Sequence, residues 1–186
     1  RYLEKIEKIL PNKGNLLDIG AATGYFIKTA ENREWNAQGL EISQYAVEQA
    51  RKQNLNIQQG TLNTGSYQPE EFDLVTMWDV VEHLSDPKSD MLKVYNVLKR
   101  GGIVAINTPD TSSLFSKLTG KYWHLLVPPE HLIYFNPRNL GDLLKRSGFE
   151  VLLIDKIGKK FTFQYVAQTL YRWQKLFIWK ELAEFF

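Results

Sequence analysis

The sequence of 186 residues has no cysteine, no long apolar run and little net charge. Without cysteine, disulfide bonds and thiolate chemistry are excluded. No stretch is long enough to span a bilayer, and no signal-peptide pattern is present. The 23 basic and 21 acidic side chains nearly cancel, so the charge alone gives no reason to expect nucleic acid as a partner. We therefore expect a cytoplasmic protein, and its start at Arg1 leads us to expect a longer parent polypeptide.

Short apolar runs alternate along the chain with segments whose apolar residues recur at helical spacing. The runs predict strands at 16–19, 37–42, 56–59, 72–77, 103–106 and 149–157. The segments predict helices at 3–10, from 25, and at 44–53, 87–98 and 137–147. This alternation is typical of an α/β protein with a doubly wound, mostly parallel sheet and helices on both faces. Right-handed connections would then place the loops after the strands along one edge, where such sheets bind ligands.

The strongest local signal is Leu-Leu-Asp-Ile-Gly-Ala-Ala-Thr-Gly at 16–24. It predicts a buried strand, a tight turn with Gly20 and Gly24, and a helix from Tyr25. The spacing fits neither the Gly-x-Gly-x-x-Gly of a dinucleotide-binding loop nor a phosphate-cradling loop. Asp18 stands before the first glycine, where a carboxylate suits an ammonium group better than a pyrophosphate. Taken alone, the segment also fits a glycine turn of any α/β protein.

Further candidate ligand-binding residues follow the next strands. Glu41 lies about 20 residues after the glycine loop, where a carboxylate can accept both hydroxyls of a ribose. A glutamate at a strand end is also common without a ligand, so its pairing with Asp18 carries the functional interpretation. Gly60 ends the third strand, and Trp78 and Asp79 follow the fourth.

Four segments, in this order, resemble the class I S-adenosylmethionine-dependent methyltransferases, in particular small-molecule enzymes of the ubiquinone and menaquinone biosynthesis type. Residues 18–24 resemble motif I, with Ala22 in place of the middle glycine. Residues 72–87 resemble motif IV and the loop after it, with Glu-His-Leu and Asp-Pro. Residues 98–109 resemble the fifth strand and its turn. Residues 128–149 resemble a subset in which a histidine-bearing loop precedes a helix ending in Gly-Phe.

The resemblance implies a Rossmann-like domain at 1–157 that binds S-adenosyl-L-methionine and releases S-adenosyl-L-homocysteine. Thr61 stands where the family often has an acid for the adenine amino group, so the backbone at 60–62 is expected to line the base. Residues 66–90 carry a net charge of −6, which favours a cationic cofactor or is a solvated acidic loop. The expected cofactor-binding residues are Asp18, Gly20, Ala21, Ala22, Gly24, Tyr25, Glu41, Ile42, Gly60, Thr61, Leu62, Trp78 and Asp79.

Methyl transfer needs an aligned acceptor more than a catalytic dyad, and we expect no metal. If the acceptor is a hydroxyl, a base is needed, and His131 is the first candidate and His83 the second. Glu-His-Leu at 82–84 can instead be a packing device at a helix start. Trp123 and Tyr134 lie in the same loop as His131 and form either an acceptor pocket or ordinary core, with equal weight on the two interpretations.

The last segment, 158–186, is aromatic and basic. Its apolar residues cover much of a predicted helix, which favours a cover for the site, a homodimer contact or a peripheral membrane contact. The family's seventh, antiparallel strand is not recognisable before Phe186. Either residues 161–167 supply it or it lies outside this sequence, and the second alternative would leave the sheet with an exposed edge or gap.

We therefore expect an enzyme that methylates oxygen or nitrogen of a small-molecule acceptor, with no nucleic acid as partner. The Asn-Pro-Pro-Tyr type of motif, typical of enzymes that methylate exocyclic base nitrogens, is absent. The alternatives are a non-catalytic module that only binds the cofactor, and a methyltransferase acting on RNA or protein that docks through the basic tail.

Overall fold

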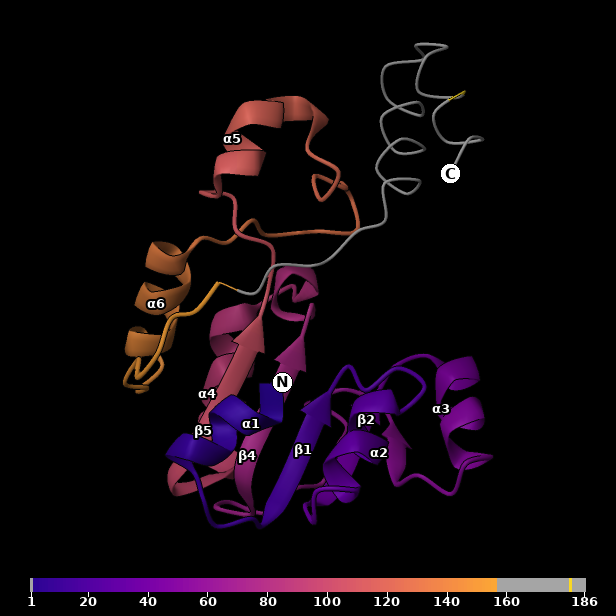
Figure 1. Ribbon diagram of the computed structural model, residues 1–186. Helices are drawn as coiled ribbons and strands as arrows, with labels where there is room; N and C mark the ends of the chain where they lie inside the picture. The colour runs from indigo at the N-terminus through magenta and orange to yellow at the C-terminus, as the bar shows by residue number, and fades with distance from the viewer. Residues whose placement is uncertain (1, 157–180, 182–186) are drawn as a thin grey trace.

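The computed structural model describes residues 2–156 and 181, which form a parallel five-stranded sheet in the order β3-β2-β1-β4-β5 (Figure 1). The strands are β1 (Asn15–Ile19), β2 (Asn36–Glu41), β3 (Ile57–Gln59), β4 (Phe72–Trp78) and β5 (Leu98–Asn107). The α-helices are α1 (Tyr2–Ile9), α2 (Tyr25–Glu31), α3 (Gln44–Arg51), α4 (Pro87–Val97), α5 (Leu114–Thr119) and α6 (Pro137–Arg146). Two 3₁₀ turns complete the set, η1 (Val81–His83) and η2 (Gly120–Tyr122).

Successive residues of the central strands face two separate hydrophobic cores, as the period of a strand requires. Leu16 and Leu74 pack in one core with α1, α2 and α3. Leu17 and Val75 pack in the other with α4, and α6 covers part of it. Figure 1 shows α1 in front of the strands and α4 behind β5. Both faces of β1 and β4 are therefore buried, which explains their nearly continuous apolar sequences.

The predicted fold class is confirmed, and the first five strands lie within a few residues of their predicted positions, except that β5 begins at Leu98. The prediction of a sixth strand at 149–157 is wrong for its described part, because residues 149–156 form no strand. A strand needs a hydrogen-bonded neighbour. This segment is apolar, but it lies across a hollow from β5 instead of beside it. Leu152, Leu153 and Ile154 are each 59% exposed.

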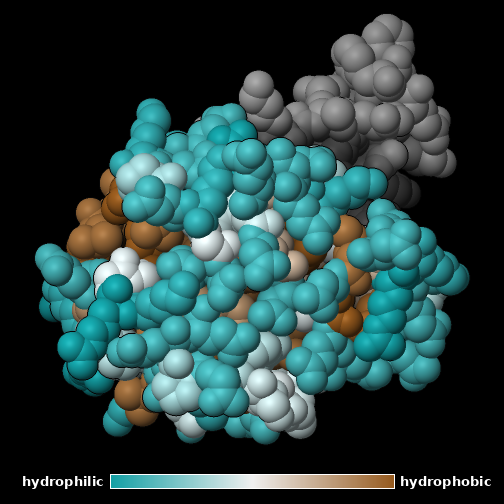
Figure 2. Space-filling view, turned by 90° about the horizontal axis from the view of Figure 1, so that it is seen from below, coloured by the Kyte–Doolittle hydropathy of each residue, from teal (hydrophilic) through white to brown (hydrophobic). Residues whose placement is uncertain are grey.

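The amino ends of the strands form a predominantly hydrophilic face (Figure 2). Ion pairs join neighbouring turns there: Lys13 with Glu34 at 3.3 Å, and Lys99 with Asp73 at 2.7 Å. Partly exposed pairs of this kind contribute only about 0–1 kcal/mol each. The candidate functional residues lie at the opposite edge, where the arrowheads point in Figure 1.

The predictions for the segment 158–186 fall outside the described residues, apart from the exposed, helical Glu181. In the part of the chain that the structure describes, no helix combines the length and the apolar character needed to cross a membrane.

We predict that Gly39→Ala destabilises the fold by about 1–3 kcal/mol, the usual cost of overpacking a core. A methyl group at this buried position of β2 would come within 2.6 Å of Ala21 Cβ and 2.9 Å of Ile57 Cγ1. Gly141→Ala in α6 is the matched control, since its methyl group meets no atom within 4 Å and alanine favours a helix. Urea unfolding of both variants measures the difference, and equal midpoints for the two would contradict the packing argument.

Candidate functional site

The glycine loop between β1 and α2 has three residues in the left-handed region: Gly20 (φ 74°), Ala22 (φ 47°) and Gly24 (φ 85°). The fold itself requires both glycines. A Cβ on Gly20 would lie 2.4 Å from Val80 Cγ2, and a Cβ on Gly24 would lie 2.5 Å from Leu55 Cδ1. Ala22, which replaces the middle glycine of the expected motif, bears a conformational cost of about 1–2 kcal/mol. Val80 and Leu55 therefore leave no room for a side chain at either glycine of this left-handed loop.

Glu41, the last residue of β2, bridges this loop to the start of α3. Its Oε2 accepts from the backbone N–H of Ala22 at 2.9 Å, and its Oε1 accepts from the backbone N–H of Ser43 at 2.8 Å. The backbone N–H of Gly60 donates to the Glu41 carbonyl oxygen at 2.9 Å. The carboxylate therefore has a fixed position at the carboxyl ends of β1, β2 and β3.

Asp18 lies one strand away from Glu41 and is only 2% exposed. Thr76, its neighbour in register on β4, donates its hydroxyl hydrogen to Asp18 Oδ1 at 2.6 Å. Burial raises the pKa of Asp18 from 3.8 to about 7; the Thr76 hydrogen bond opposes this shift, and the charge of Glu41 adds to it. A cationic group at this edge would favour the ionised form.

The remaining residues expected at the first three strand ends differ in their surroundings. Ala21 is buried, whereas Tyr25 is 84% exposed and Ile42 is 69% exposed. Thr61 belongs to a turn closed by Thr64, whose hydroxyl accepts from the Thr61 N–H at 2.9 Å. Leu62 packs against the core that contains α4.

Trp78 and Asp79, which end β4, face in different directions. The Trp78 ring packs between Tyr2, at 4.7 Å between centroids, and Phe26, at 5.1 Å. Its Nε1 is buried and has no hydrogen-bond partner. Asp79 adopts a left-handed conformation (φ 54°) and is clamped to Asn107 of β5, whose Nδ2 donates to Asp79 Oδ1 at 2.7 Å. Trp78 therefore packs toward α1 and α2, and Asp79 faces β5.

Glu82 is a buried carboxylate in η1, just beyond Asp79, and is 2% exposed. Thr108 donates its hydroxyl hydrogen to Glu82 Oε2 at 2.9 Å, while Oε1 is buried without a hydrogen-bond partner. The carbonyl oxygen of Glu82 accepts from the N–H groups of Leu132 and Ile133 at 2.9 and 3.1 Å. These backbone bonds hold the distant loop around His131 against η1.

His83 and His131 meet as a result, with ring centroids 4.8 Å apart. Nδ1 of His83 lies 2.7 Å from the carbonyl oxygen of Glu130, and Nδ1 of His131 lies 2.8 Å from that of Leu125. A carbonyl oxygen only accepts, so each Nδ1 carries the hydrogen. In the neutral ring, Nε2 therefore keeps its lone pair for a proton or a metal ion.

The aromatic residues Trp123 and Tyr134 of the same loop were expected to form either an acceptor pocket or ordinary core, and they differ in burial. Trp123 is 7% exposed and is a core residue by burial. Tyr134 is half-buried, its ring lies 6.1 Å from that of His131, and its hydroxyl is buried without a hydrogen-bond partner. His124 packs on Phe115, with centroids 5.8 Å apart, and is not part of the histidine pair. Of these residues, Tyr134 is the one whose ring packs against the histidine pair, at His131.

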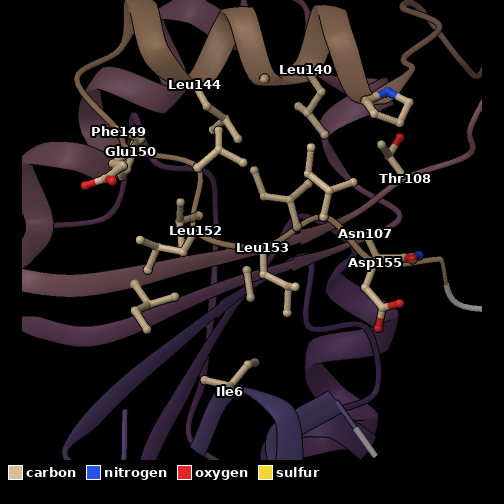
Figure 3. A pocket seen from close by; sticks show the side chains of 18 of the residues that line it. Ile6, Asn107, Thr108, Leu140, Leu144, Phe149, Glu150, Leu152, Leu153 and Asp155 are labelled. Carbon is tan, nitrogen blue, oxygen red and sulfur yellow. The ribbon is translucent and has the colours of Figure 1, made fainter. Parts of the chain in front are cut away.

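A hollow of about 1210 Å³ runs along the exposed edge of β5. Figure 3 shows Leu140 and Leu144 of α6 facing it, with Leu153 opposite and Ile6 of α1 on the far side. Asn107 and Thr108 lie at its end near the histidine loop. The hollow lies beside the exposed edge of β5, away from Glu41 and the glycine loop.

The acidic stretch 66–90 is largely committed to the fold. Asp73 and Glu70 form ion pairs with Lys99 and Arg100, and Asp90 pairs with Lys93. Asp86 caps α4 by accepting from the backbone N–H of Ser89 at 3.1 Å. The three cations lie outside the stretch and offset half of its net charge of −6.

Polar partners, whose pairing the sequence did not indicate, hold four acidic side chains in place. They are the backbone N–H of Ser43 for Glu41, Thr76 for Asp18, Asn107 for Asp79, and Thr108 for Glu82. Glu82 was not among the expected site residues, although the two valines before it and Leu84 after His83 signal a buried position. Short polar side chains at strand ends are common, so their pairing is visible only in the folded chain.

Known proteins resemble this chain over most of its length. A sequence profile of the family described as a methyltransferase domain matches residues 1–154. The chain is 27% identical over 149 residues to the ubiquinone biosynthesis O-methyltransferase of Pseudomonas aeruginosa, covering 73% of this chain and 64% of that protein. It is 25% identical over 155 residues to the chloroplastic 2-methyl-6-phytyl-1,4-hydroquinone methyltransferase 1 of Oryza sativa, covering 78% and 44%. The chain thus spans less than two thirds of these two curated relatives.

Among solved structures, a SAM-dependent methyltransferase of Thermotoga maritima, described as a possible histamine N-methyltransferase, gives a TM-score of 0.64 at 25% identity. The match covers 81% of this chain and 71% of that one. A SAM-dependent methyltransferase of Archaeoglobus fulgidus gives a TM-score of 0.67 at 18% identity, which shows a shared fold.

We predict that the stability difference between the wild type and Asp18→Asn depends on pH. The folded protein keeps the Asp18 proton up to about pH 7, whereas the unfolded chain loses it near its ordinary pKa of 3.8. The folded state then binds more protons in this window, so the Asp18 contribution to stability falls as pH rises from about 4 to about 7. Asparagine does not titrate.

The measurement is the free energy of unfolding of both proteins at about pH 5 and about pH 8. We expect the wild type to lose stability relative to Asp18→Asn between these values. A difference that stays constant would show that the Asp18 pKa is not raised.

Proposed function

This chain belongs to the methyltransferase-domain family of S-adenosylmethionine-dependent enzymes, and from that premise we propose that it methylates a small-molecule acceptor. The observation that carries the proposal is the fixed carboxylate of Glu41 beside the glycine loop. It lies where a nucleoside ribose meets the carboxyl ends of β1 and β2 in open α/β sheets. Both carboxylate oxygens already have one backbone donor, and each has a further lone pair for a ribose hydroxyl.

The surrounding residues fit the rest of the cofactor. Asp18, whose pKa is raised to about 7, pairs with the ammonium group of the methionine part. The backbone from Gly60 to Leu62 lines the base. Trp78 supplies a buried N–H that has no hydrogen-bond partner among the described residues. S-adenosylmethionine itself supplies a methyl group activated on a positively charged sulfur.

The acceptor side favours a hydroxyl over an amine. A neutral amine is nucleophilic without help, whereas a hydroxyl benefits from a base that takes its proton. Nε2 of His131 is available for this step because its Nδ1 hydrogen is held by the Leu125 carbonyl oxygen. His131 takes the hydroxyl proton as the new oxygen–carbon bond forms and the sulfur–carbon bond breaks, and S-adenosylhomocysteine leaves. Tyr134 lines this side.

The acceptor class follows from the same chemistry and from the relatives. Two of them are named for a hydroquinone and for ubiquinone biosynthesis, which supports an aromatic hydroxyl compound. The competing functions are a module that binds the cofactor without turnover and a methyltransferase for RNA or protein. Turnover over a panel of catechols, hydroquinones and amines separates the first from an enzyme. A steep loss of acceptor binding with salt would indicate RNA.

We predict that Glu41→Ala weakens binding of S-adenosylhomocysteine by about 1–3 kcal/mol, because hydrogen-bonding groups in the site lose their partner. Isothermal titration measures the change. Glu48→Ala is the control, since Glu48 is an exposed residue of α3 whose carboxylate accepts from Gln44 of the same helix, and the affinity of this variant should equal that of the wild type. Unchanged affinity in Glu41→Ala would remove Glu41 from the site.

We predict that His131→Ala lowers turnover about 10²–10⁴-fold, the usual contribution of a general base, and leaves the affinity for S-adenosylhomocysteine unchanged. His124→Ala, in the same loop but outside the histidine pair, should keep near wild-type turnover. Initial rates on the best acceptor of the panel and titration of the cofactor product give the two quantities. Full turnover in His131→Ala would place the base elsewhere.

A further inference from the structure

Glu82, His83 and His131 come from two separate parts of the chain and converge on one point. One ligand-capable atom from each lies within 4.8 Å of those of the other two. We propose that these three side chains bind a divalent first-row transition-metal ion, with Zn²⁺ as the reference ion. Two imidazoles and one carboxylate are the donors that such ions prefer, whereas Mg²⁺ and Ca²⁺ prefer oxygen donors alone. The site is assigned from these side chains and does not depend on the methyl-transfer proposal.

Both imidazoles are held in the form that a metal ligand needs. In metal sites, a ligating histidine commonly donates its other ring N–H to a backbone carbonyl or a carboxylate. Here His83 and His131 each direct Nδ1 to a backbone carbonyl oxygen, at 2.7 and 2.8 Å. The Nε2 atoms are left with their lone pairs, and the ring orientations are already fixed. The outer contacts of a metal site are therefore present on both rings.

Glu82 provides an independent indication of a missing partner. Its side chain is 2% exposed, yet Oε1 is buried with no hydrogen-bond partner in the described part of the chain, while Oε2 accepts from Thr108. An unpartnered buried carboxylate oxygen is costly. A cation bound between this carboxylate and the two histidines supplies the missing partner, and the Thr108 hydroxyl orients the ligand from behind.

Three protein ligands leave at least one coordination position open, which is the pattern of a catalytic metal site. The bond lengths of Zn²⁺ to nitrogen and oxygen are about 2.0–2.2 Å, so the three side chains must draw closer on binding. His83 is exposed, so solvent and the ion reach the cluster from its side. Tyr134 lies beside the cluster, with its ring centroid 6.1 Å from that of His131, and its buried hydroxyl has no hydrogen-bond partner among the described residues.

The consequence for catalysis rests on the proposed methyl transfer. An acceptor hydroxyl bound at the open position would lose its proton more readily, because a bound metal ion lowers the pKa of a ligated hydroxyl. The metal-free mechanism expected from the sequence would then be incomplete. His131 would act as a ligand in the metal-bound enzyme, and the hydroxyl proton would pass to solvent.

The test is metal binding by the intact chain after treatment with a chelator. We expect one equivalent of Zn²⁺ to bind in competition with a chromophoric chelator. We also expect Co²⁺ to give the visible absorption of a nitrogen- and oxygen-ligated site, and excess Mg²⁺ not to displace either ion. Failure to bind Zn²⁺ and Co²⁺ stoichiometrically would overturn the proposal.

Three variants locate the ion. His83→Asn is the primary variant, because His83 is exposed and its replacement should not disturb the core; His131→Asn is the second. Each should weaken Zn²⁺ binding at least about tenfold, since even outer-shell changes cost about 10–100-fold. His124→Asn, which keeps the loop but lies outside the cluster, should bind as the wild type does. Equal affinity in all four proteins would overturn the assignment.

Titration with S-adenosylhomocysteine on the same samples separates this proposal from the proposed function. Metal binding without cofactor binding would reject the methyltransferase function and keep the metal site. Cofactor binding without metal binding would reject the metal site and keep the function.

Discussion

The carboxylate of Glu41 is the point on which the candidate cofactor site depends. Its hydrogen bonds to the N–H groups of Ala22 and Ser43 connect β1, β2 and α3. Ala22 needs this support, because a non-glycine residue in the left-handed region is held only where its surroundings compensate the cost. The same carboxylate is thus a structural clamp in the free protein and a ribose ligand in the proposed complex. The charge of Glu41 also reaches Asp18 and contributes to the raised pKa of that residue.

The order of strands and helices could be predicted because each is encoded locally. Apolar runs, glycine turns and helical spacing lie within a few residues of each other, and Asp18, Gly20 and Glu41 meet because adjacent parallel strands end at one edge. The sixth strand could not be predicted in the same way. Residues 149–156 have strand-like composition, but a ladder needs a partner at the right distance, and β5 lies across the hollow.

The histidine cluster lay beyond sequence reasoning for a related reason. His83 and His131 are 48 positions apart, and no periodic pattern links them. What brings them together is the backbone pairing of Glu82 with Leu132 and Ile133, and backbone pairs in irregular segments leave little trace in composition. The sequence contains one signal for this cluster. Glu82 lies between two valines and Leu84, and an acid in such an apolar segment is seldom buried without a partner.

The two buried carboxylates, Asp18 and Glu82, lie in different kinds of structure at the edge of the sheet. Asp18 has Thr76 as a partner within a regular ladder, so its position is as rigid as the sheet. Glu82 has Thr108 as a partner but stands in a 3₁₀ turn against irregular loop. Loops of this kind tolerate replacement better than strands do. In the proposed function the strand ends bind the cofactor and the loops bind the acceptor, so changes in the loops alter the acceptor without disturbing the cofactor. The relatives are named for different acceptors.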